Sequence, residues 1–176
     1  MRMRTYLPLL FLSGLMAPAH LPAQNTPSAS MDLGVVTAAI APGDRVEVPV
    51  TLVTRNEARV GTASLEVAYL PHSVSFLEAV LGSSAQGGIL KAEEAPGEEG
   101  KNVIHVEIVS SGPLSEGLLV NLVFEALESI TERQETVLEN LQPKASSVEG
   151  TEIAARGLDG AITPVEVIPA CLFYMH

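Results

Sequence analysis

The stretch that decides the fold is APGDRVEVPVTL, at residues 41–52. Pro42 and Gly43 predict a turn, because proline fixes φ and glycine tolerates a left-handed conformation. After the turn, every second residue is apolar, as in a strand with one buried face: Val46, Val48, Val50 and Leu52. Pro49 cannot donate to a β-ladder, so we expect this strand to lie at a sheet edge or to have its N–H side free there.

Further strand-like segments lie on both sides of this one and are separated by turn residues. The strongest is expected at residues 118–127, with one face formed by Leu118, Val120, Leu122, Phe124 and Ala126. The others are expected at residues 32–39, 63–69, 74–81, 89–92, 103–109, 137–141, 148–153 and 161–168. About nine short alternating segments at this spacing predict an all-β fold, an antiparallel β-sandwich.

The first 23 residues have the pattern of a signal peptide. Arg2 and Arg4 form a basic region, residues 7–16 form an apolar region, and small residues at 17–19 or 21–23 offer cleavage sites. The apolar run is shorter than the roughly 20 residues that a spanning helix needs, although an uncleaved anchor is the alternative. We therefore expect a protein that is secreted, on the cell surface or in the periplasm, with no membrane span after leader cleavage. The expected division is a leader at 1–23, a flexible lead-in at 24–33, one domain at 34–168 and an apolar tail at 169–176.

The composition disfavours several classes of function. Loss of the leader would remove two arginines and change the net charge from -11 to -13, because all 21 acidic residues remain and the basic residues fall from 10 to 8. Such an acidic surface repels phosphate backbones, so nucleic-acid binding is disfavoured. Cys171 is the single cysteine, which rules out an internal disulfide.

The sequence contains no recognisable catalytic or metal-binding motif, so we expect neither an enzyme nor a cofactor. Of the four histidines, His72 falls in a turn beside Ser73 without a nucleophile motif, and His105 falls on the polar face of a strand. The His and Cys residues do not have the spacing of zinc ligands. The glutamates at 93, 94, 98 and 99 flank a Pro-Gly turn but lack the spacing of a calcium loop, so no metal site is predicted.

Four phrases, in order along the chain, resemble those of cohesin modules. Residues 42–50 (PGDRVEVPV) resemble the opening P-G-D-x-V-x-V-P-V, and residues 117–124 (GLLVNLVF) resemble a late G-x-L-x-x-[IL]-x-F strand. Residues 69–74 (YLPHSV) resemble Y-D-P-x-V-L-x, with Leu70 where the family favours Asp and one inserted residue. Residues 159–165 (DGAITPV) resemble the closing phrase. The resemblance covers roughly residues 34 to 166.

This resemblance implies a jelly-roll sandwich of nine strands whose ligand is a dockerin, a small calcium-loaded helical module carried by an enzyme of polysaccharide degradation. The dockerin would dock on one open sheet face. The corresponding surface here is the polar side of the central strands: Ser64, Glu66, His105 and Glu107. The alternative interpretation is that these positions are merely solvated, because strand alternation alone places polar residues there.

Two other functions suit the same sandwich. A carbohydrate-binding module predicts exposed, coplanar aromatic rings, yet the chain has no Trp and few Tyr or Phe, most of them in core register. A structural adhesion or envelope subunit predicts a long unprotected edge strand, or an apolar patch formed by residues 172–175. We favour the protein-binding module.

Overall fold

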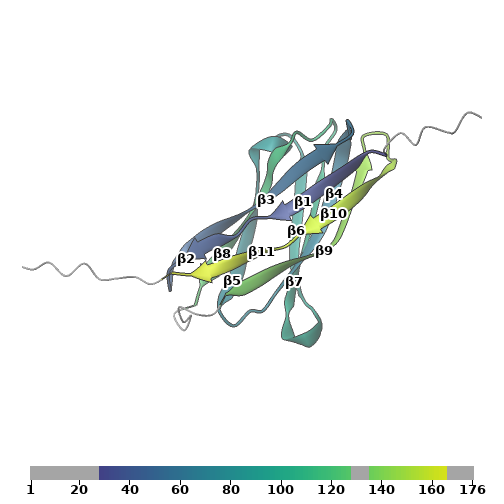
Figure 1. Cartoon of the computed structure of the whole chain (residues 1–176). Helices are drawn as coiled ribbons and strands as arrows, with labels where there is room; N and C mark the ends of the chain where they lie inside the picture. Colours follow the sequence, from purple (N-terminus) through teal and green to yellow (C-terminus); the bar gives the residue numbers. More distant parts are fainter. Residues whose placement is uncertain (1–27, 128–134, 166–176) are drawn as a thin grey trace, which may run out of the picture.

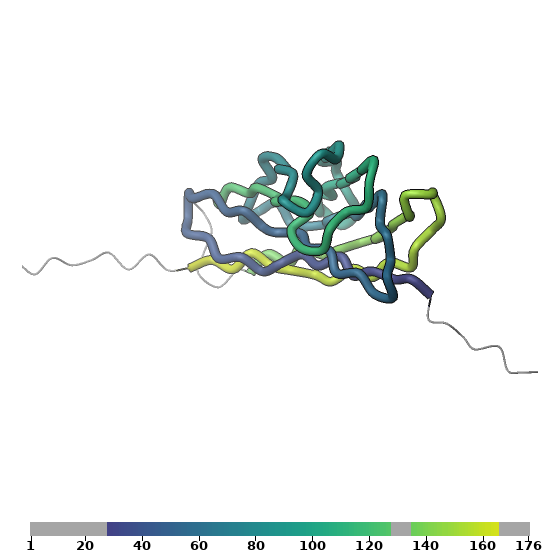
Figure 2. The backbone as a smooth tube through the Cα atoms, turned by 90° about the horizontal axis from the view of Figure 1, so that it is seen from above, coloured from purple at the N-terminus to yellow at the C-terminus, as the bar shows by residue number. Residues whose placement is uncertain are grey.

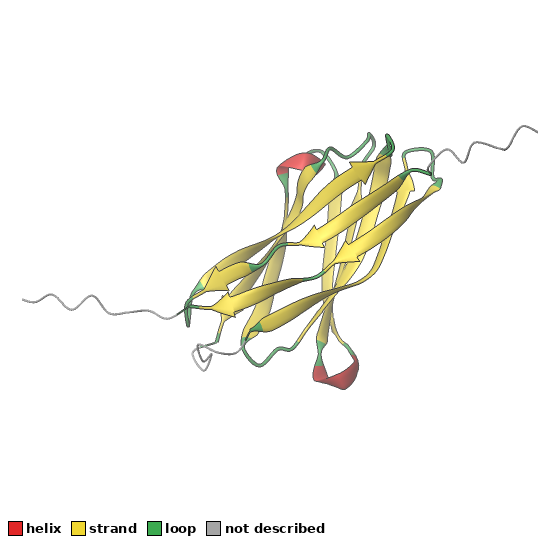
Figure 3. Ribbon diagram, in the orientation of Figure 1, coloured by secondary structure: helices red, strands yellow, loops and turns green. Residues whose placement is uncertain are grey.

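The structure is a computed structural model that describes residues 28–127 and 135–165. Most of the described chain is β-strand, with a short 3-10 turn at each of two opposite ends (Figure 3). The turns are η1 (Ser83–Ala85) and η2 (Glu98–Gly100). The strands are β1 (Ser30–Val35), β2 (Ala38–Ile40), β3 (Arg45–Arg55), β4 (Val60–Tyr69), β5 (Val74–Leu81), β6 (Ile89–Pro96), β7 (Asn102–Val109), β8 (Gly117–Ala126), β9 (Thr136–Ser147), β10 (Glu152–Leu158) and β11 (Gly160–Pro164).

The strands form two layers that enclose one core. Their hydrogen-bonded order is β5-β8-β3-β1-β10-β9-β4-β7-β6, which folds over so that β5 and β6 come into contact. One layer is therefore β5-β8-β3-β1 and the other is β9-β4-β7-β6. From above, the purple N-terminal and yellow C-terminal strands run together along one side of the molecule (Figure 2). The β-sandwich expected from the sequence is confirmed.

The core consists of the inward residues of both layers. Alternation places Leu65 and Ile104 of one layer against Val50 and Leu122 of the other, and all four are at most 2% exposed. Phe124 is fully buried and contacts two rings edge to face, with centroid distances of 5.3 Å to Tyr69 and 5.8 Å to Phe76. Such edge contacts stabilise aromatic pairs beyond their burial. The aromatic residues of the described chain thus belong to the core.

The described residues form eleven strands rather than about nine, partly because the strand predicted at 32–39 is interrupted opposite Pro49. The Pro49 carbonyl accepts a hydrogen bond from the Val36 N–H at 2.9 Å. In an antiparallel ladder the nitrogen of the same residue faces the same neighbour, and proline has no hydrogen to donate. β3 is hydrogen-bonded on both sides, so the edge position considered for this strand is wrong. The alternative holds, because the nitrogen side of Pro49 faces the gap between β1 and β2.

The first two and last two strands of the described chain pair with each other and so join the two layers. β1 pairs with β10 and β2 with β11, both in parallel, whereas β3 and β9 flank them in antiparallel (Figure 1). These are two parallel pairs in a sandwich expected to be antiparallel. β1 and β11 approach each other closely at Gly160. Glycine is needed at this position, because a Cβ there would lie 2.6 Å from the Val35 carbonyl oxygen.

Three strands differ from expectation for local reasons. In β8 a bulge at Leu119 turns that residue into the core and leaves Leu118 half-buried, against the single register predicted from 118 to 126. The strand predicted at 148–153 begins only at Glu152, because the Ser147 hydroxyl accepts the N–H groups of Glu149 and Thr151 and holds a turn. The strand predicted at 137–141 continues to Ser147, through a bulge at Gln142 with φ 46°.

Several sequence predictions fall outside the described residues: the leader at 1–23, Cys171 and the apolar tail at 169–176. β1 begins at Ser30, within the stretch expected as lead-in. In the part of the chain that the structure describes, no helix is long and apolar enough to cross a membrane.

Candidate partner-docking face

The four predicted docking residues lie side by side on one sheet surface. β4 and β7 pair in a register that sets Ser64 opposite Glu107 and Glu66 opposite His105. Their neighbours in sequence, such as Leu65 and Val106, point into the core, so alternation directs these four side chains outward. The Glu66 carboxylate lies 3.3 Å from His105 Nδ1, and these two side chains are 29% and 52% exposed. The structure therefore brings all four together in the middle of an open surface.

The flanking strands add residues that the sequence did not single out. On β6, Lys91 lies opposite Glu107 and pairs with it at 3.4 Å, and Glu93 lies opposite His105. On β9, Lys144 lies opposite Ser64. The outward surface of β6, β7, β4 and β9 is hereafter the four-strand face.

The sequence pattern could have identified the flanking residues of β6 but not the one of β9. The polar alternation of Lys91 and Glu93 marks the outer side of β6, and this signal could have been found once the strand was extended beyond residue 92. In β9, Gln142 and Pro143 resemble the end of a strand, so nothing local indicated that Lys144 returns to the sheet after the bulge.

Two of the hollows on the four-strand face are lined by Glu66 and His105. The first, of about 340 Å³, lies over its centre and is lined by all four predicted residues together with Lys91, Glu93, Gln142 and Lys144. The second, of about 550 Å³, lies beside the β6–β7 hairpin and shares Glu66 and His105 with the first. Another hollow, of about 310 Å³, shares Lys101 and Glu139 with the second and is lined in part by His72 and by Leu70, which departs from the cohesin phrase.

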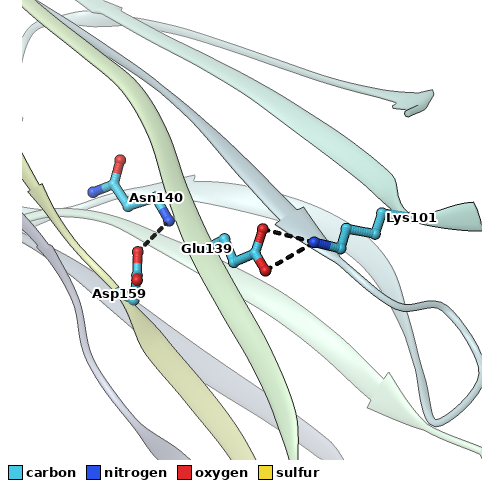
Figure 4. A network of polar contacts seen from close by, with 4 residues as sticks. All are labelled: Lys101, Glu139, Asn140 and Asp159. Atoms are coloured by element: carbon cyan, nitrogen blue, oxygen red, sulfur yellow. Dashed lines mark hydrogen bonds and ion pairs between the residues drawn. The ribbon is translucent and has the colours of Figure 1, made fainter. Parts of the chain in front are cut away.

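Glu139 and Asn140 of β9 both make polar contacts (Figure 4), and Glu139 with its partner Lys101 lines the second hollow. Both carboxylate oxygens of Glu139 accept hydrogen bonds from Lys101 Nζ at 2.8 Å, and this contact raises the pKa of Lys101 above its ordinary value. On the next residue, the backbone N–H of Asn140 donates to Asp159 at 2.8 Å. The Asn140 side chain is buried and donates to the Leu33 carbonyl at 2.7 Å, which ties β9 to β1.

A second network connects β4, β5, β6 and β7 near the β6–β7 hairpin. The Tyr69 hydroxyl donates to Glu94, which also accepts from Asn102 at 2.9 Å, and the Phe76 N–H donates to the Tyr69 oxygen at 3.1 Å. Burial and the hydrogen bond to the Glu94 carboxylate raise the pKa of Tyr69 to about 12.

Tyr69 is therefore expected to make the domain sensitive to alkali. The tyrosine of the unfolded chain ionises near its ordinary pKa of 10.0, so below that pH the contribution of Tyr69 to stability does not change with pH. Stability then falls as pH rises toward about 12, because the unfolded chain loses the proton more easily than the folded one. The rise of the Tyr69 pKa from 10.0 to about 12 corresponds to a loss of at most about 2 to 3 kcal/mol in the free energy of unfolding. Urea unfolding at about pH 9 and about pH 11.5 measures it. Tyr69→Phe should lose this part of the pH dependence; equal slopes for both proteins would contradict the assignment.

The described residues form no group of three or more His, Cys, Asp or Glu side chains suited to hold a metal ion. Of the residues considered for a nucleophile, Ser73 is buried and His72 is exposed in the turn after β4. Tyr69 and Phe124 are buried and Phe76 packs against the core, so these rings form no flat aromatic platform for a sugar. The geometry on the four-strand face suits protein recognition by charge and shape.

Comparison with known proteins places the fold. No family model matches the sequence and no curated protein does. A non-cellulosomal cohesin from Archaeoglobus fulgidus aligns with a TM-score of 0.64 at 21% identity, over 84% of this chain and 99% of that one.

Two bacterial structures agree. The sixth cohesin of scaffoldin B from Acetivibrio cellulolyticus, solved with a Cel5 dockerin variant, has a TM-score of 0.65 at 21% identity, over 77% of this chain and 99% of that one. The seventh ScaB type I cohesin from Pseudobacteroides cellulosolvens has 0.64 at 17%, over 84% and 98%. The described chain has the fold of cohesin domains.

Proposed function

We propose that this chain is an exported, non-catalytic module that binds a protein partner of the dockerin type through the four-strand face. The observation that carries the proposal is the position of Ser64, Glu66, His105 and Glu107, which form one contiguous outward surface over a hollow of about 340 Å³. The cohesin fold supports it, since several structures with this fold were solved as complexes with dockerins.

The partner is a calcium-loaded dockerin-like module, and the assembly acts in polysaccharide degradation or at the cell surface. The leader-like residues 1–23 support export. The four-strand face suits a reversible protein contact, because its centre combines the Lys91–Glu107 ion pair with a hollow that a partner's side chains can fill. The chain needs no cofactor of its own in this role.

The test is capture of partners by the chain from Gln24 onward, which keeps every described residue. It is immobilised and exposed to the host's secreted proteins with calcium and, separately, with a chelator. Retention of a dockerin-bearing protein that chelator releases supports the proposal. Retention of the chain on insoluble polysaccharide, with no protein captured, would favour a carbohydrate-binding module instead. Self-association through the edge strands β5 and β6, with no protein captured, would favour a structural subunit.

Glu66→Ala is expected to weaken partner binding by at least about tenfold, because Glu66 lies at the centre of the face, where truncations cost most. His105 would lose its partner at 3.3 Å as well. Titration calorimetry with the captured dockerin module measures the change. Glu78→Ala, on exposed β5 of the other layer, is the matched control and should bind as the wild type does. Equal loss in both variants would rule out the four-strand face.

A further inference from the structure

The hollow beside the β6–β7 hairpin combines an apolar floor with an acidic rim. Its volume is about 550 Å³, and its floor is formed by Ala68, Val103 and Leu141. Ala68 is buried, and Leu141 is 39% exposed, so this apolar surface is open from outside. The side chains that line the rest of the hollow are mainly charged, and they come from β4, β7, β9 and the hairpin.

The charges of the rim do not balance. Four carboxylates line the hollow, against one lysine, Lys101, with His105 counted as neutral. Lys101 is already held by both oxygens of Glu139. Glu98 and Glu99, in the hairpin turn, lie beyond ion-pairing distance of any cation among the described residues. An excess of negative charge therefore surrounds a partly apolar hollow.

This excess is confined to one end of the four-strand face. Toward the middle, Lys91 and Lys144 lie on either side of Glu107 and Ser64. At the far end, Ile89 lies opposite Val109, and both are exposed, at 65% and 39%. Along β6 and β7 the face thus changes from apolar through mixed charge to acidic, which favours one orientation of a partner over the reverse.

The chemistry of the hollow selects a long cationic side chain. Such a side chain lays its methylene stem on an apolar surface and directs its charged head to the carboxylates. Arginine suits the hollow better than lysine, because its planar guanidinium has five donors and can serve two carboxylates at once. An acidic side chain would be repelled, and a neutral one would leave the rim carboxylates without a counter-charge.

We propose that this hollow receives an arginine side chain that projects from the surface of the protein partner. The identity of the partner as a dockerin-type protein rests on the proposed function, whereas the preference for arginine rests on the hollow alone. The arginine fixes the orientation of the partner, with its apolar contacts directed to Ile89 and Val109 at the opposite end of the face.

The first experiment needs no partner. The ¹⁵N-labelled chain from Gln24 onward is titrated with Nα-acetyl-arginine amide and, separately, with the neutral isostere Nα-acetyl-citrulline amide, at constant ionic strength. Saturable shifts of the backbone amides of Ala68, Val103 and Leu141 are expected with the arginine compound, at an affinity at least about fivefold above that of the citrulline compound. Equal effects of the two compounds, or shifts spread evenly over the acidic surface, would overturn the proposal.

Paired charge-removing variants locate the effect. The double variant Glu98→Gln/Glu99→Gln removes two rim carboxylates that are not among the docking residues and should weaken arginine-amide binding about tenfold. The control Glu78→Gln/Glu125→Gln makes the same change of charge on the other layer and should leave binding unchanged. The dispersion of each amide spectrum reports whether the variant is folded. Equal weakening by both variants would mean that net charge, rather than the hollow, attracts the compound.

The two proposals can fail separately. If a dockerin-type protein is captured but binds the double variant and the control alike, the arginine assignment is wrong and the proposed function stands. If no protein is captured while the arginine compound still binds the hollow selectively, the proposed function fails and the hollow remains a site for a cationic side chain. Capture of a protein whose binding falls in the double variant alone supports both.

Discussion

Phe124→Ala is expected to lower the free energy of unfolding by about 3 to 5 kcal/mol, the range for truncation of a buried aromatic side chain. Phe124 is fully buried in β8, where its ring contacts Tyr69 and Phe76 edge to face. These rings come from β4 and β5, so the cavity would open where the two layers meet. The loss is a large fraction of the total stability of a domain of this size.

Urea unfolding followed by far-ultraviolet circular dichroism measures this change. Phe124→Leu fills most of the cavity and should cost much less, about 1 to 2 kcal/mol. Glu125→Ala, one residue along the strand and on its outer side, should change stability by no more than about 0.5 kcal/mol. If Phe124→Ala were no more harmful than Glu125→Ala, the packing of β8 against the opposite layer would be wrong.

Asn140→Asp is expected to cost about 3 to 5 kcal/mol at neutral pH, because it leaves an unpaired charge in the interior. Asn140 is 8% exposed and its side-chain amide donates to the Leu33 carbonyl at 2.7 Å. A carboxylate there would lose that hydrogen bond and face the carbonyl oxygen, with the Asp159 carboxylate bound to the N–H of the same residue. β9 would lose its side-chain tie to β1.

The pH dependence of this variant gives the sign of the effect. Burial and the neighbouring Asp159 would raise the pKa of the new carboxyl above that of the unfolded chain, so the folded state binds the proton more tightly. The deficit relative to the wild type should therefore grow as pH rises through the carboxyl range and shrink as pH falls. Gln142→Glu adds the same charge at an exposed position of β9 and should have little effect. A deficit that does not depend on pH would contradict the buried-charge explanation.

The outward position of the docking residues followed from strand alternation. Ser64 and Glu66 alternate with Ala63, Leu65 and Val67, and His105 and Glu107 alternate with three buried residues of β7. This pattern identifies the outer side of each strand because the side-chain period in a strand is two. It does not identify the neighbouring strand. That Glu66 faces His105 depends on the register between β4 and β7, which are separated in sequence by two other strands.

Patterns failed where one residue disturbs the period. The bulge at Leu119 shifts β8 by one position, and the bulge at Gln142 hides the continuation of β9. A single extra residue leaves no clear mark in the sequence, but it moves every residue on one side of it to the opposite face of the sheet. Lys144 was missed as a member of the face for this reason, and Leu118 was assigned too deep a position.

By itself, the sequence determined that this protein is an all-β sandwich, where most of its strands begin, and which of their sides is polar. These features are local, since they depend on alternation and on turn residues such as Pro42 and Gly43. Only the tertiary structure decided that β1 and β10 join in parallel, that Pro49 lies in an interior strand and that the four-strand face has an acidic end. Each depends on contacts between residues far apart in the chain, which are formed by closing the two layers over one core.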